Sequence, residues 1–146
     1  RYNYIITIKQ HLLKNIMSTR ALIHIYNKSE DETPLTTIYK HYDGYPTKYG
    51  VGQTLKEYVR NSVLTNGLPL DASDNGFTHT HNGMGCFAAG IINHLKDGPG
   101  DVYIESPGEE DRHQSYTYEI RPGKSLDDRM SLLMKEHSIG ETRALL

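Results

Sequence analysis

The sequence is poor in cysteine, in net charge and in apolar residues, and each shortage argues against a class of protein. Cys86 is the only cysteine, so an intrachain disulfide is impossible and a reducing, cytoplasmic location is expected. The net charge of −2 gives no overall electrostatic footprint for nucleic acid. With 36% apolar residues, the chain does not have the composition of a membrane protein. We therefore expect neither nucleic acid nor a membrane as its partner.

Tryptophan is absent and phenylalanine is rare, so tyrosine provides most of the aromatic side chains. The chain has eleven tyrosines and two phenylalanines. Tyrosine is favourable on half-buried strand faces and on polar contact surfaces alike, so this excess does not choose between structure and binding. At 146 residues the chain is long enough for one domain with a core of its own.

Residues 1–16 stand apart from this domain, because the following Met17-Ser18-Thr19-Arg20 resembles a natural start. We expect the domain itself to span residues 17–146. Alternating side chains in the first segment predict an edge strand or a partner-contacting arm, with a passive, non-native extension as the alternative. The alternating residues are Tyr2, Tyr4, Ile6 and Ile8.

Hydrophobic periodicity predicts an α+β fold. Alternating β-branched and aromatic residues predict four strands, at 21–26, 35–42, 101–106 and 115–121. A spacing of about 3.6 residues between apolar side chains predicts three helices, over 51–66, over 84–95 and from Ser125 onward. The stripe that predicts the last helix consists of Leu126, Met130, Leu133 and Met134.

The order of these elements indicates a two-layer architecture. Both strand pairs have connections of hairpin length, and no strand–helix–strand alternation is present, which argues against a doubly wound parallel sheet. We expect one antiparallel sheet built from two hairpins, with two or three helices packed on one face. Edge strands and exposed tyrosines need cover, so a homodimer is a further expectation.

The first candidate site is the histidine pair His79 and His81. In an extended segment the two side chains point the same way, so both can reach one divalent metal ion. A third ligand would come from elsewhere in the chain. The candidates are His41, Asp43, Cys86 and His94. No established metal-binding spacing is present, so ordinary loop histidines are the alternative and no cofactor is predicted outright.

Cys86 is the second candidate, as a catalytic nucleophile. It lies near the start of the predicted helix at 84–95, where backbone amides stabilise a thiolate. A later histidine, His113, follows it in the chain order of papain-like hydrolases, but without their flanking residues. An inert cysteine buried on an apolar helix is the alternative.

The stretch Lys40-His41-Tyr42-Asp43-Gly44-Tyr45-Pro46 is the third candidate. His41 and Asp43 share one side of an extended chain, so the carboxylate can orient the imidazole as a general base. Asp and Gly also form an ordinary turn pair, which is the structural alternative. As binding residues we expect Lys40, Tyr42, Tyr45 and, beside the glycines at 50 and 52, Lys48.

Two features together resemble a group of small, mostly uncharacterised proteins common in phage and marine microbial sequences. Those proteins open with a Met-Ser-Thr-Arg-like start and contain a His-Trp/Tyr-Asp-Gly-Tyr-Pro motif after two short strands. The matching residues here are 17–20 and 41–46, with Tyr42 in place of the usual tryptophan. Agreement ends at Thr47-Lys48, where the group often has Glu-Gly. The resemblance implies a phage-associated origin, host-cell cytoplasm and a start at Met17, and it implies no activity.

Two hypotheses of different classes follow, so whether the chain is an enzyme stays open. In the first, the protein is a small interaction module that contacts a protein or a small ligand through its tyrosine-rich sheet and neighbouring loops. In the second, it is a small hydrolase with a metal centre or a cysteine nucleophile and a histidine base. The second hypothesis requires five side chains to meet in one pocket: His41, Asp43, His79, His81 and Cys86.

Overall fold

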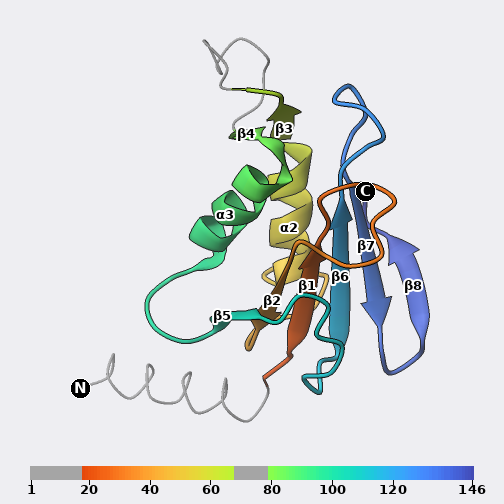
Figure 1. Ribbon diagram of the computed structural model, residues 1–146. Helices are drawn as coiled ribbons and strands as arrows, with labels where there is room; N and C mark the ends of the chain where they lie inside the picture. The colour runs from red at the N-terminus through yellow and green to blue at the C-terminus, as the bar shows by residue number, and fades with distance from the viewer. Residues whose placement is uncertain (1–17, 68–78) are drawn as a thin grey trace.

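The computed structural model describes residues 18–67 and 79–146 (Figure 1). The strand expected among residues 1–16 lies outside this part of the chain. Within it, a six-stranded sheet and two helices form the two layers of a mixed α+β fold. The fold class predicted from the sequence is therefore confirmed at this level.

The sheet has the strand order β5-β2-β1-β6-β7-β8. Its central pair, β1 (Ala21–Ile25) and β6 (Tyr116–Arg121), is parallel, with Ile23 beside Tyr118. Every other neighbouring pair is antiparallel. The remaining strands are β2 (Thr36–Lys40), β5 (Val102–Glu105), β7 (Ser131–Glu136) and β8 (Glu141–Ala144).

The helices α2 (Val51–Arg60) and α3 (Gly83–Leu95) both lie on one face of the sheet (Figure 1). Beyond the end of α2, β3 (Ser62–Thr65) and β4 (His79–Asn82) form a small parallel pair. Neither described helix has the length and apolar content needed to cross a bilayer.

The core lies between the helices and the sheet, and strand alternation determines which residues enter it. Ile23 and Ile25 of β1 face the helices, and Leu55 of α2 and Phe87 of α3 belong to the same core. None of these four side chains has exposed surface. Burying each such side chain contributes about 1.5–3 kcal/mol. The same core includes Ile38, Tyr118, Ile120, Leu132 and Met134.

The predicted final helix is wrong, because residues 131–136 and 141–144 form the hairpin β7–β8. The stripe from Leu126 to Met134 fits a helical period, but Met130, Leu132 and Met134 also alternate with a period of two. All three are buried, and pairing with β6 selects the strand.

The second predicted hairpin is also wrong. The strand at 102–105 pairs with β2 at the sheet edge, whereas β6 pairs with β1 in parallel at the centre. The short connection between β5 and β6 therefore crosses the sheet rather than making a hairpin. The first predicted hairpin, β1 with β2, is confirmed. Helix α2 ends at Arg60, earlier than predicted, because residues 62–65 pair with β4.

The turn at residues 43–52 joins β2 to α2 through close backbone contacts. The Gly44 N–H donates to the Thr19 carbonyl at 2.7 Å, and the Val51 N–H donates to the Asp43 carbonyl at 2.7 Å. From the middle of the sheet, the buried Tyr118 hydroxyl donates to the Gly44 carbonyl at 2.7 Å. These bonds hold the start of α2 against β1 and β6.

Glycine is required at position 52 by this packing. A Cβ there would lie 2.5 Å from Pro46 Cα and 2.7 Å from the Tyr118 hydroxyl oxygen. We expect Gly52→Ala to lower the free energy of unfolding by about 1–3 kcal/mol, because a methyl group must displace the backbone. Urea unfolding followed by circular dichroism measures the change.

Gly85→Ala is the matched control, since Gly85 lies in α3 and a Cβ there would meet nothing within 4 Å. It should raise stability by up to about 1 kcal/mol, the difference in helix propensity. Equal effects of the two substitutions would contradict the packing described for the turn.

Candidate functional site

Tyrosine rings gather on the face of the sheet that points away from the helices. Ile38 and Lys40 face the helical layer, so Tyr39 between them faces the opposite way. Tyr39 is the direct cross-strand partner of Tyr103 on β5. The two rings stack with centroids 5.9 Å apart and planes inclined at 30°. Tyr103 remains 49% exposed, and Lys96 Nζ lies over its ring at 6.0 Å from the centroid.

His41 continues this aromatic surface beyond the end of β2. Its Nδ1 lies 2.6 Å from the Tyr39 hydroxyl oxygen, and its ring meets Tyr42 edge-on at 4.5 Å. Burial raises the pKa of Tyr39, and the charge of Arg20 opposes that rise. A protonated Tyr39 hydroxyl can donate to Nδ1 and so orient the imidazole.

A buried ion pair supports this surface from behind. Lys40 is only 8% exposed, and its Nζ lies 2.5 Å from Asp101 Oδ2 and 2.7 Å from the Tyr42 carbonyl. The other carboxylate oxygen of Asp101 accepts the Tyr42 N–H at 2.9 Å. Asp101 has a φ of +65°, a strained conformation for a residue with a side chain. The pair therefore fixes the backbone of Tyr42 relative to β5.

Together these residues line the tyrosine cleft, a cavity of about 700 Å³. Arg112 is paired with Glu105 at 2.5 Å, whereas Arg20 has no ionic partner among the described residues. The cleft therefore combines aromatic walls with one available guanidinium. Its lining consists of Arg20, Tyr39, His41, Tyr42, Pro99, Gly100, Asp101, Tyr103, Glu105, Asp111, Arg112 and His113.

The four predicted binding residues have different places relative to this cleft. Tyr42 lines it, and Lys40 lies behind it in the ion pair with Asp101. Tyr45 belongs to the turn, where its carbonyl accepts the Gly52 N–H at 3.2 Å. Lys48 Nζ lies 5.1 Å from the ring centre of Tyr49, and neither Tyr45 nor Lys48 is among the lining residues.

The second group, here called the imidazole cluster, comprises His79, His81 and His94 around the ring of Tyr58. Centroid distances from Tyr58 are 4.2 Å to His79, 5.7 Å to His81 and 4.8 Å to His94. Residues 79–82 form the strand β4, which meets the condition of an extended segment that the metal hypothesis set for His79 and His81. The tyrosine ring is close to all three imidazoles, and no set of metal-ligating side chains converges among the described residues.

His81 is the buried member of this cluster. It is 6% exposed, and its Nε2 lies 3.2 Å from the Tyr58 hydroxyl oxygen. Burial lowers the pKa of His81, with a smaller effect from His79. The pKa of His79 is lowered by burial and then by His94. Both imidazoles are therefore held in the neutral form at pH 7.

The five side chains required by the hydrolase hypothesis are not brought to one pocket. Residues 41–43 adjoin the start of α2, through the bond from Val51 to Asp43. His79 pairs with Ser62, just after the last turn of α2. The ten-residue helix between them is about 15 Å long. Cys86 has an exposed position on α3 and makes no hydrogen bond with a described residue.

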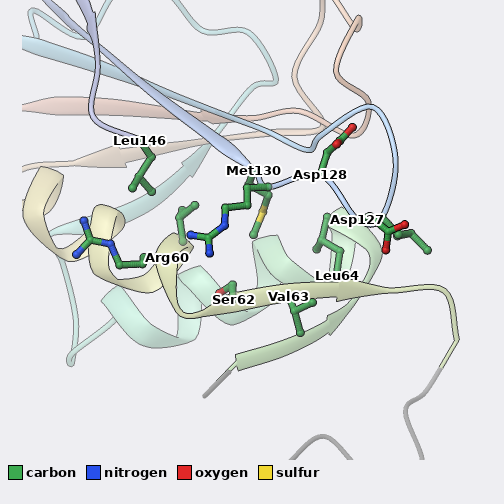
Figure 2. Close-up of a pocket in the computed structure, with 11 residues that line it drawn as sticks. Arg60, Ser62, Val63, Leu64, Asp127, Asp128, Met130 and Leu146 are labelled. Atoms are coloured by element: carbon green, nitrogen blue, oxygen red, sulfur yellow. The ribbon is translucent and has the colours of Figure 1, made fainter. Parts of the chain in front are cut away.

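A further cavity of about 590 Å³ lies between the end of α2, β3 and the segment before β7 (Figure 2). Its floor is apolar, with Leu64 and Met130 facing it, and Figure 2 shows Arg60 and Asp127 toward opposite ends. No aromatic or histidine side chain is among its lining residues. It is therefore a weaker candidate for specific recognition than the tyrosine cleft.

Comparisons with protein-family models, with curated proteins and with solved structures gave no significant match. The functional argument therefore depends on the geometry of the described residues.

The sequence interpretation missed several residues of the cleft: Arg20, Asp101, Tyr103, Glu105 and Arg112. Alternation placed Tyr39 beside His41, but residues 101–105 join them only through the pairing of β5 with β2. The paired residues lie about sixty positions apart in the sequence, as do Lys40 and Asp101 of the ion pair. A local pattern has no signal for such a contact.

The imidazole cluster predicts a specific pH dependence of stability. Because burial lowers the pKa of His81 below its ordinary value of 6.5, protonation favours the unfolded chain. Stability should be complete above pH 6.5 and fall as the pH drops through the lowered value. Urea unfolding at pH 7.5 and at pH 5.0 measures this loss. His81→Gln should make the loss smaller, although His24, His79 and His137, whose pKa values are also lowered by burial, still contribute.

Tyr58→Phe is the matched control, since it removes the same hydrogen bond and keeps the imidazole. It should lower stability at both pH values and retain the pH-dependent loss. An undiminished loss in His81→Gln would show that His81 does not titrate on unfolding.

Proposed function

We propose that the protein is a binding module whose tyrosine cleft accepts a small ligand with a planar ring and an anionic group. The single observation behind this proposal is the meeting, in one cavity, of stacked tyrosines with the guanidinium of Arg20, which has no ionic partner among the described residues. The volume, about 700 Å³, falls within the range of small-molecule sites.

The aromatic walls favour a planar group. The half-exposed ring of Tyr103 and the other aromatic rings of the lining, those of Tyr39, His41 and Tyr42, favour contact with a flat ring. The ion pair behind Tyr42 holds that residue in place before binding, so little ordering entropy is lost when a ligand arrives.

The charges of the cleft favour a ligand that has an anionic group attached to its planar ring. Arg112 is neutralised by Glu105 and Asp101 by Lys40, so Arg20 is the cation left without a described partner. Asp111, 3.9 Å from His113, is the remaining exposed carboxylate of the lining, so the anionic group of a ligand would lie beside Arg20 and away from Asp111. His41 adds a donor, because its Nε2 carries the proton when Nδ1 accepts from Tyr39. A carboxylate or phosphate next to Arg20 would use both groups.

The lining favours binding over covalent catalysis. Among the described residues, it contains no serine, threonine or cysteine, and so no hydroxyl or thiol nucleophile of the serine- or cysteine-hydrolase type. A cytoplasmic, phage-associated protein remains part of this proposal, supported by the lone Cys86 and by the resemblance of residues 41–46.

A paired ligand panel tests the proposal. The probes are small aromatic acids, both carboxylates and phosphates, each matched with its neutral amide or alcohol. Amide chemical shifts of the ¹⁵N-labelled protein report binding and its location. We expect the acids to shift residues 39–42 and 101–105, and the neutral partners to bind at least tenfold more weakly. Arg20→Met should weaken binding of the acids by a similar factor, about 1.4 kcal/mol.

Tyr49→Ala is the matched control variant, because Tyr49 is exposed and lies outside the cleft lining. It should leave affinity unchanged, whereas Tyr103→Ala should reduce it. If no acid of the panel shifts the cleft resonances, or if Arg20→Met binds them as well as the wild type does, the proposal is wrong.

A further inference from the structure

The strand β8 is an open edge of the main sheet. All four of its residues are exposed, and no described strand pairs with its outer side. The Leu145 N–H donates to the Leu132 carbonyl on β7 at 2.8 Å. Backbone groups alternate in direction along an antiparallel strand, so those of Thr142 and Ala144 point away from β7. This edge therefore offers donors and acceptors to another strand.

The charges of β8 have no ionic partner among residues 18–67 and 79–146. Glu141 lies directly across from Glu136 of β7, a like-charge pair that is unfavourable at cross-strand distance. Arg143 lies across from Met134, which supplies no charge. Neither Glu141 nor Arg143 forms an ion pair among the described residues. Both side chains lie on the same face of the strand, because they are two residues apart.

We propose that β8 pairs antiparallel with β8 of a second copy of this chain, about a two-fold axis at Thr142. In this register the two Thr142 residues exchange backbone hydrogen bonds, as their outward N–H and C=O groups require. Glu141 of each copy then lies directly opposite Arg143 of the other. The same four residues thus provide two ion pairs and one continuous sheet across both copies, a self-complementary contact.

The ends of the strand agree with this arrangement. Antiparallel pairing places the 137–140 turn of one copy beside the residues that follow β8 in the other. Ile139, in that turn, is 60% exposed, and Leu146 is also exposed. In the dimer, Ile139 of one copy and Leu146 of the other would bury part of each other's exposed surface.

The opposite sheet edge, β5, lacks such a pattern. Its one charged residue, Glu105, is already paired with Arg112. A symmetric pairing of β5 would place Val102, Tyr103 or Ile104 opposite that carboxylate and supply no cation. The choice of β8 over β5 therefore depends on charge complementarity, and the dimer leaves the tyrosine cleft on β5 free.

Charge reversal tests the register directly. Sedimentation velocity over a concentration series should show a concentration-dependent dimer for the wild type. E141R creates like charges across the axis, as does R143E, and each should raise the dimer dissociation constant at least tenfold. The double variant E141R/R143E exchanges the two charges and should restore dimerisation.

Mixing the two single variants provides a stricter test. In an equimolar mixture of E141R with R143E, every introduced charge faces its opposite, so a heterodimer should form although neither variant dimerises alone. Thr142→Pro, which removes the central backbone donor, should abolish dimers in any charge background. Lys124→Glu, at an exposed residue outside β8, is the control and should dimerise as the wild type does.

Circular dichroism of each variant checks that the monomer remains folded. A wild type that stays monomeric throughout the concentration series overturns the proposal. A dimer that persists unchanged in both single variants, or a double variant and a mixture that both stay monomeric, also overturns it.

Discussion

The hydrogen bond from the Tyr118 hydroxyl to the Gly44 carbonyl is the contact on which the rest of the fold depends. It joins the centre of the sheet to the turn that precedes α2, at 2.7 Å and away from solvent. Burial raises the pKa of Tyr118, so the hydroxyl stays protonated and remains a donor. An unpaired hydroxyl or carbonyl there would cost about 1–3 kcal/mol, so the turn has one favourable position.

This constraint gives the stretch 41–46 two roles that the sequence alone does not separate. His41 and Tyr42 face the tyrosine cleft, whereas Asp43 and Gly44 hold the start of α2 through backbone bonds. The same helix places Tyr58 at its other end, among the imidazoles of the small β3–β4 sheet. The tyrosine cleft and the imidazole cluster therefore adjoin opposite ends of α2, which runs from the turn after β2 to the β3–β4 pair (Figure 1).

Local patterns predicted the parts of this structure that local forces determine. The hairpin of β1 with β2 and the helix at 83–95 follow from alternation and from a helical stripe within one segment. The apolar residues within 130–134 fit the period of a helix and that of a strand, and only the pairing of β7 with β6 decides for the strand. The tyrosine cleft escaped prediction for the same reason, because Tyr103 reaches Tyr39 through strand pairing and Arg20 joins them from before β1.

Hydrogen exchange of individual amides tests the central claim most directly. The N–H groups of Gly44 and Val51 are bonded within the turn, and the Tyr118 hydroxyl holds that turn against the sheet. If the turn is part of the cooperative core, these amides should exchange as slowly as Ile23 in the central strand, through global unfolding alone. Exchange of Gly44 and Val51 at the rates of unprotected loop amides, while Ile23 stays protected, would contradict the account.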